Sequence, residues 1–156
     1  IVMPFQKQVQ IGLAAGVPGG AYSLNQEVVT VKLAALAALI ANFVWLDPTK
    51  DQVKNSGTGK PMGLAVRTRV DAQLQFGEEA SQTVKAGDPV TVAVKGEYYV
   101  LANTQAVIGQ AVFANTTTGA VSTAAPGSTV AGCVETDWRV ITAAPAGQPF
   151  AISAWR

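Results

Sequence analysis

Alternation of apolar and polar residues over positions 64–76 is the feature that most limits how this chain can fold. Apart from Thr68, apolar side chains stand at every second position from Leu64 to Phe76, and mostly polar side chains occupy the positions between them. A period of two places one set on the buried face of a β-strand and the other set on its wet face. The sequence therefore predicts a long, half-buried strand beginning near Gly63.

Shorter β-type segments follow at regular spacing, with turns rich in Gly and Pro between them. A turn at residues 95–97 separates two of them, and residues 115–119 form the turn of a predicted hairpin. Such a series is typical of a sandwich or barrel. We therefore expect a mainly β protein with a single β-sandwich or barrel domain and at most short helical turns. The segments expected to form strands are 90–94, 98–101, 108–114, 120–123, 130–134, 138–142 and 150–155.

Residues 28–46 carry mixed signals. Leucines at helical spacing and many alanines favour a helix in the middle, whereas both ends are rich in β-formers. We expect a strand, one or two helical turns, and a second strand. The longest apolar run, residues 33–41, has nine residues, and a membrane span needs roughly 18 or more. We therefore expect no membrane partner.

Residues 1–26 differ from the rest of the chain, because glycines interrupt short apolar pieces and Lys7 is their only charge. No helix or strand pattern lasts long enough to pack by itself, yet the apolar residues suit a solvated tail poorly. We expect residues 1–26 to form an extended arm, ordered against another surface or left as a flexible terminus. Residues 27–156 are then the β domain.

Charge is scarce, and this excludes several functional classes. Charged residues make up 13% of the 156 residues, against about 25% in an ordinary soluble domain. The formal net charge of +1 with few basic residues argues against nucleic-acid binding. The absence of His excludes His-dependent triads and His-ligated metal sites, and the single Cys133 excludes an intrachain disulfide. We expect no cofactor and no metal.

Two stretches come closest to catalytic or phosphate-binding motifs. Residues 57–60, Gly-Thr-Gly-Lys, have part of the P-loop pattern, but Lys54 occupies the first Gly position and Pro61 replaces the Ser or Thr. A solvated turn is the better interpretation. Glu135 and Asp137 would share one face of an extended segment beside Trp138, which leaves sugar hydrolysis open. A charged turn between two strands is far commoner, so we expect no enzyme.

Residues 98–134 form a run of 37 residues without a charge, and residues 8–26 carry none either. A surface of Thr, Ser and Ala wet by hydroxyl groups is one interpretation. A lone soluble protein, however, normally spreads charges over its exposed faces, and depletion of charge marks the buried centre of protein–protein interfaces. We therefore expect another chain to cover part of these stretches.

Four segments have a sequence texture typical of a known family. They are 43–48 (Phe-Val-Trp-Leu-Asp-Pro), 86–92 (Ala-Gly-Asp-Pro-Val-Thr-Val), 108–115 (Ile-Gly-Gln-Ala-Val-Phe-Ala-Asn) and 138–155. On these segments, and over nearly the whole chain, the sequence resembles tailed-bacteriophage capsid cement (decoration) proteins. The resemblance implies a β-rich virion protein on the outer surface of the capsid, made in the bacterial host cytoplasm. Its implied partners are an HK97-type major capsid protein, whose contacts it reinforces, and itself.

A capsid repeats its contacts by symmetry, so an oligomer can engage several subunits at once and gain effective concentration. We expect a homotrimer at threefold positions, with a dimer at twofold positions as the alternative. A head-fibre or glycan-binding β module of a phage particle is the alternative function. The residues expected at interfaces are Phe5, Ile11, Leu13, Tyr22, Trp138 and Trp155, although a core role is open for each aromatic residue among them.

Overall fold

The computed structural model describes residues 16–23, 27–67 and 83–155, and every regular element in them is a β-strand. The expectation of a mainly β protein with a barrel is therefore confirmed. Among the described residues, no helix has the length and apolar character that crossing a bilayer requires. The strands are β1 (Val28–Ala34), β2 (Ala38–Leu39), β3 (Phe43–Leu46), β4 (Gln52–Lys54), β5 (Gly63–Val66), β6 (Thr83–Val84), β7 (Pro89–Lys95), β8 (Glu97–Val100), β9 (Ala111–Asn115), β10 (Val121–Ala124), β11 (Cys133–Val140) and β12 (Phe150–Ser153).

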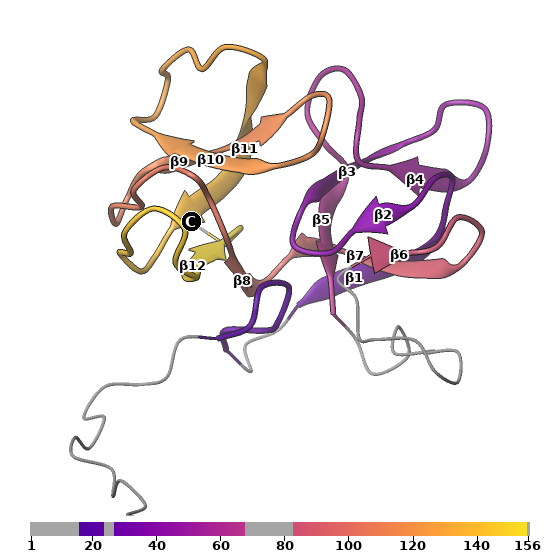
Figure 1. Cartoon of the computed structure of the whole chain (residues 1–156), viewed down its shortest axis with the longest axis horizontal. Coiled ribbons are helices and arrows are strands. Elements are labelled where there is room, and N and C mark those ends of the chain that lie inside the picture. The colour runs from indigo at the N-terminus through magenta and orange to yellow at the C-terminus, as the bar shows by residue number, and fades with distance from the viewer. Residues whose placement is uncertain (1–15, 24–26, 68–82, 156) are drawn as a thin grey trace, which may run out of the picture.

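A closed barrel with the strand order β1-β4-β3-β5-β7 takes up the first half of the described chain (Figure 1). β7 pairs antiparallel with β1, with Thr91 opposite Val31, and a short parallel pairing of Leu33 and Ala34 with β4 joins the other edge of β1. Five strands enclose a narrow interior, so the side chains that fill it are small. This inner cluster includes Ala34, Val44, Val53, Ala65, Val90 and Val92.

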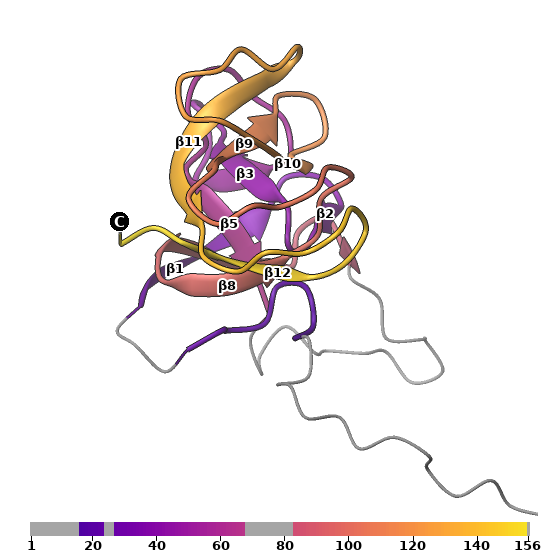
Figure 2. The same ribbon diagram turned by 90° about the vertical axis from the view of Figure 1, so that its left-hand side faces the viewer.

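The second half of the chain forms a five-stranded sheet with the order β10-β9-β11-β12-β8, and Figure 2 shows its edge strand β8 beside β12. In Figure 1 it is the orange and yellow half, beside the purple barrel. The predicted hairpin is confirmed, because β9 and β10 pair antiparallel with Val121 opposite Ala114. The predicted turn at residues 95–97 is confirmed as well, and it carries the chain from β7 of the barrel to β8 of the second sheet.

One hydrophobic core joins the barrel to the second sheet. Side chains alternate along β3, so that Phe43 and Trp45 enter the core between the two sheets while Val44 points into the barrel. β5 does the same with Leu64 outside and Ala65 inside. Both faces of these short strands are therefore buried, which explains why each reads as a continuous apolar run.

The helical turns expected within residues 28–46 are wrong. The chain instead forms β1, the two-residue strand β2 and β3, and Ala38 of β2 pairs with Val84 of β6. Ala41 adopts a positive φ of 66°, which breaks any helical path. A nine-residue apolar run is too short to hold a helix without packing, and burial of Ala34 and Ala38 in the barrel outweighs the helix propensity of alanine.

Of the strand predictions, the long strand that begins near Gly63 is tested only in part, and the pair at 130–134 and 138–142 needs correction. β5 begins at Gly63 as expected, but most of the predicted long strand, residues 68–82, lies outside the described residues. The two strands expected at 130–134 and 138–142 are one strand, β11, so the charged turn between them is wrong. A register shift between Glu135 and Arg139 lets β11 run through the charged residues as a bulged strand.

Segments of the chain itself cover the outer edges of the second sheet. Main-chain hydrogen bonds join Gly19, Gly20 and Tyr22 to the edge of β8, and Ala21 bridges to Tyr98. Along β10, Ala102 bridges to Val121, and the hydroxyl groups of Thr104 and Thr123 are hydrogen-bonded. The predicted arm, residues 1–26, lies mainly outside the described residues, and its boundary with the domain of residues 27–156 stays a prediction.

Candidate binding surfaces

The two carboxylates weighed as a catalytic pair are both held in ion pairs on β11. Glu135 pairs with Arg139 at 3.2 Å and also accepts a hydrogen bond from the main-chain N–H of Gly127. Asp137 pairs with Lys60 of the loop before β5 at 2.6 Å. These contacts link two loops to β11, so both acids have structural partners.

The other residues considered for chemistry are the loop at 57–60 and Cys133. Residues 57–60 lie in an irregular loop, as predicted, and the carbonyl of Gly59 accepts a hydrogen bond from the indole of Trp45. Cys133 begins β11 and is partly exposed. Within the described ranges, no group of three or more His, Cys, Asp or Glu side chains comes together as a metal site.

The residues predicted at interfaces separate into three groups. Phe5, Ile11 and Leu13 lie outside the described residues. Tyr22 and Trp155 lie at the surface, where Tyr22 packs edge-on against Tyr99 and the ammonium of Lys95 lies 5.1 Å from the centre of the Trp155 ring. Both remain available for contacts with another chain.

Trp138 belongs to the shared core and is only 4% exposed. Its ring centre lies 6.4 Å from that of Phe43 and 6.3 Å from that of Tyr98. Most of the Trp138 side chain therefore lies in the core, which is the role that the sequence left open. An interface role for any of the named residues stays a prediction.

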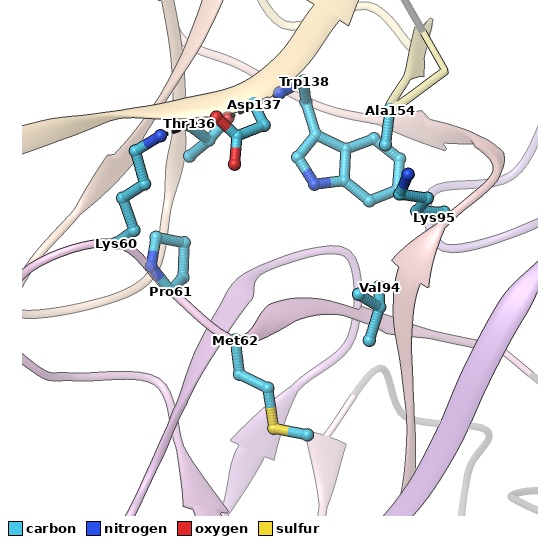
Figure 3. A pocket seen from close by; sticks show the side chains of 9 residues that line it. All are labelled: Lys60, Pro61, Met62, Val94, Lys95, Thr136, Asp137, Trp138 and Ala154. Atoms are coloured by element: carbon cyan, nitrogen blue, oxygen red, sulfur yellow. Dashed lines mark hydrogen bonds and ion pairs between the residues drawn. The ribbon is translucent and has the colours of Figure 1, made fainter.

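A small cavity lies at the junction of the barrel and the second sheet, against one edge of Trp138 (Figure 3). We call it the junction cavity; its volume is about 140 Å³. Strands from both sheets and the loop before β5 contribute to it, so no contiguous motif signals it in the sequence. The residues that line it are Lys60, Pro61, Met62, Val94, Lys95, Thr136, Asp137, Trp138 and Ala154.

The outer face of β1 carries an exposed apolar row that the sequence reasoning missed. Val29, Val31 and Leu33 are 42%, 61% and 46% exposed. Residues directly opposite in an antiparallel pair share a face, and Lys32 lies opposite Val90 of the barrel interior. Lys32 is therefore on the inner side, and its ammonium reaches the exposed carboxylate of Asp51. We call Val29, Val31 and Leu33 the β1 row.

The signal for the β1 row is present in the sequence. Apolar residues alternate with Thr30 and Lys32 over residues 29–33, which predicts a strand with one apolar and one polar face. The usual inference would bury the apolar face. Here the closed barrel places it outward, and only the pairing of β1 with both β7 and β4 shows this.

Comparison with known proteins gives one family and two structural likenesses. The family model of the XM1 gp53 minor capsid protein matches residues 5–154. A chain of the capsid of Myoviridae phage XM1 has a similar fold, with a TM-score of 0.66, 15% identity, and coverage of 97% of this chain and 98% of that one.

The N base of head fiber gp8.5 of bacteriophage phi29 gives a TM-score of 0.48 at 15% identity, covering 82% of this chain and 93% of that one. No curated protein matches the sequence.

Proposed function

Because the chain belongs to the XM1 gp53 minor capsid protein family, we propose that it is a cement, or decoration, protein of a phage head. Membership makes it a structural protein associated with a phage capsid. The finer proposal is that it binds the outer surface of the head and reinforces the contacts between major capsid subunits of the HK97 type.

The observation that carries the cement role is the β1 row. In a barrel that works alone in water, polar side chains normally face outward, as they do on the wet face of a half-buried sheet. Here Val29, Val31 and Leu33 face outward while Lys32 lies on the inner side. Burial of apolar surface contributes about 25 cal/mol per Å², so the row is suited to a partner surface rather than to water.

The uncharged stretch of residues 98–134 supports the same role. It supplies β9, β10 and the loops around them, and Leu101, Val107 and Ile108 are exposed within it. A surface without charges that exposes aliphatic side chains has the composition of an interface centre. Such surfaces make modest contacts, which become strong when symmetry lets several engage together.

We propose a homotrimer at threefold positions of the head, with a dimer at twofold positions as the alternative. Residues 1–26 then act as an arm that reaches neighbouring subunits. Residues 19–22 already add to the β8 edge through main-chain hydrogen bonds, and we propose that residues 1–15 contact other chains by the same kind of strand addition. Deletion of residues 1–15 removes none of the described residues, so it tests the arm.

The direct experiment adds the purified protein to heads that lack it. We expect saturable binding at a fixed ratio and increased resistance of the heads to heat. Val31→Lys should weaken binding, because it places a charge in the β1 row, whereas Gln148→Lys adds the same charge to an exposed turn and should not. Removal of residues 1–15 should weaken attachment while the domain stays folded.

Three results would contradict parts of this proposal. Absence of binding to heads would refute the cement role, and binding to cell-surface glycans instead would favour a head-fibre or receptor-binding module. Equal binding by Val31→Lys and the wild type would remove the β1 row from the contact. Full-strength binding by the shortened chain would do the same for the arm.

A further inference from the structure

The two most buried tryptophans differ in what their indole N–H groups bind. Trp45 donates its Nε1–H to the carbonyl oxygen of Gly59 at 2.9 Å. Trp138 is equally buried, at 4% exposed, but no hydrogen bond between described residues uses its Nε1–H. In the part of the chain that is described, no fully enclosed side-chain nitrogen or oxygen lacks a partner. The Trp138 N–H is therefore reached from the junction cavity, and Figure 3 shows its ring nitrogen turned into that space.

The polar groups around the junction cavity are mostly donors. Two lysines and one aspartate line it, which gives a formal charge of +1. The aspartate, Asp137, is already paired with Lys60. Thr136 uses its hydroxyl within the sheet, donating to the carbonyl of Val112 and accepting from the main-chain N–H of Trp138. The indole N–H of Trp138 is left to face an incoming acceptor, and the ammonium of Lys95, which lies over the Trp155 ring, stands at the rim of the cavity.

The remaining walls of the junction cavity are apolar, formed by Pro61, Met62, Val94 and Ala154. A volume of about 140 Å³ is close to that of a cavity of about 150 Å³ that takes up benzene, so the space suits one side chain. An apolar wall beside two donors and a net positive charge fits a short aliphatic chain that ends in a carboxylate.

We propose that the junction cavity binds an acidic side chain, Asp or Glu, of a neighbouring polypeptide in the capsid shell. The carboxylate accepts hydrogen bonds from Nε1 of Trp138 and Nζ of Lys95, and its methylene groups lie against Met62 and Val94. This inference rests on the proposed attachment to heads. It adds a charged contact to the apolar ones, and the N–H of Trp138, which opens into the cavity, gives that contact its specificity.

The first test uses the isolated protein and two small probes, propionate and its neutral analogue propionamide. The indole N–H resonances of Trp45, Trp138 and Trp155 are followed by ¹⁵N–¹H NMR and assigned from Trp→Phe variants. Propionate should shift the Trp138 resonance saturably and leave that of Trp45 in place, and propionamide should have much less effect. Lys95→Gln should weaken the response to propionate. An unchanged Trp138 resonance, or equal shifts with both probes, would overturn the proposal.

The second test measures binding to heads that lack the protein. Trp138→Phe keeps the aromatic ring and removes the N–H, and Lys95→Gln removes the ammonium from the rim. Each should bind heads about tenfold more weakly, the effect of losing one hydrogen bond to a charged group. Lys50→Gln is the matched control, because Lys50 is exposed and does not line the cavity.

The outcomes separate this inference from the proposed function. If the wild type binds heads and both cavity variants bind equally well, the cavity proposal is wrong and the cement role stands. If the wild type does not bind heads, the cement role is wrong, and the NMR titration alone decides whether the cavity binds a carboxylate. If Trp138→Phe unfolds, Lys95→Gln and the propionate titration give the answer.

Discussion

The turn between β9 and β10 touches the barrel at Gly119, and a single methyl group there should weaken the whole fold. The carbonyl of Gly119 accepts a hydrogen bond from the N–H of Phe43 in β3 at 2.8 Å. Gly119 has a φ of +71°, and a Cβ atom at this position would lie 2.2 Å from the carbonyl oxygen of Phe43. Gly119→Ala therefore combines backbone strain with a clash against main chain that has no room to move.

The cost of Gly119→Ala can be estimated in two parts. A residue with a Cβ in the left-handed region costs about 1–2 kcal/mol. Relief of the clash moves the turn away from β3 and breaks the Phe43–Gly119 hydrogen bond at a fully buried residue, which costs about 1–3 kcal/mol more. Gly132→Ala is the matched control, because Gly132 has a φ of +69° and open space where its Cβ would lie. It should show only the first part.

Urea unfolding followed by tryptophan fluorescence measures the difference. The midpoint should fall further for Gly119→Ala than for Gly132→Ala, with the same dependence on urea concentration in both variants. Equal midpoints would refute the reasoning, because they would mean that the turn moves without cost and that this hydrogen bond does not hold the second sheet to the barrel.

Three further substitutions test other contacts. Burial and a hydrogen bond from its hydroxyl to Glu27 raise the pKa of Tyr98 above its ordinary value of about 10. The stability from this site is therefore present below pH 10 and is lost as the pH rises toward the raised pKa, so the advantage of the wild type over Tyr98→Phe in urea unfolding should shrink above pH 10. An advantage that stays constant there would contradict the assignment. Trp45→Phe removes the hydrogen bond to Gly59 and should lower the free energy of unfolding by at least about 1 kcal/mol, and an unchanged urea midpoint would show that this bond is dispensable. Val31→Lys should change the free energy of unfolding by less than about 0.5 kcal/mol because Val31 is exposed; a larger loss would give the β1 row a role within the fold.

Local patterns predicted the parts of this fold that depend on neighbouring residues. The hairpin of β9 and β10 follows from two β-type runs around a Thr-Gly turn, and both strands overlap the predicted segments, although β9 begins three residues later than expected. β7 begins at Pro89, and Pro149 directly precedes β12, as expected for a residue that cannot donate to a ladder. In each case the signal and the structure involve the same short segment.

The parts that could not be predicted depend on residues far apart in the chain. Closure of the barrel needs β1 to pair with β7 and also with β4, and neither partner can be read from the sequence of β1. The junction cavity joins the loop before β5 to the end of β7 and to β11, so its donors come together only after folding. Arg139 supports the charged residues of β11 as a strand through its pair with Glu135, where the sequence suggested a turn.

The covered sheet edges explain why side-chain surfaces should dominate attachment. An open strand edge is a template for pairing with any other chain, which would let identical copies join without limit. The closed barrel has no such edge along its paired strands, and the second sheet has residues 19–22 against β8 and Ala102 with Thr104 against β10. Main-chain pairing by the described domain is thereby restricted. In the proposed cement role, recognition by this domain therefore falls to exposed side chains, such as those of the β1 row, and to the donors of the junction cavity. The proposed closed oligomer fits the same restriction, because its copies do not add to one another without limit.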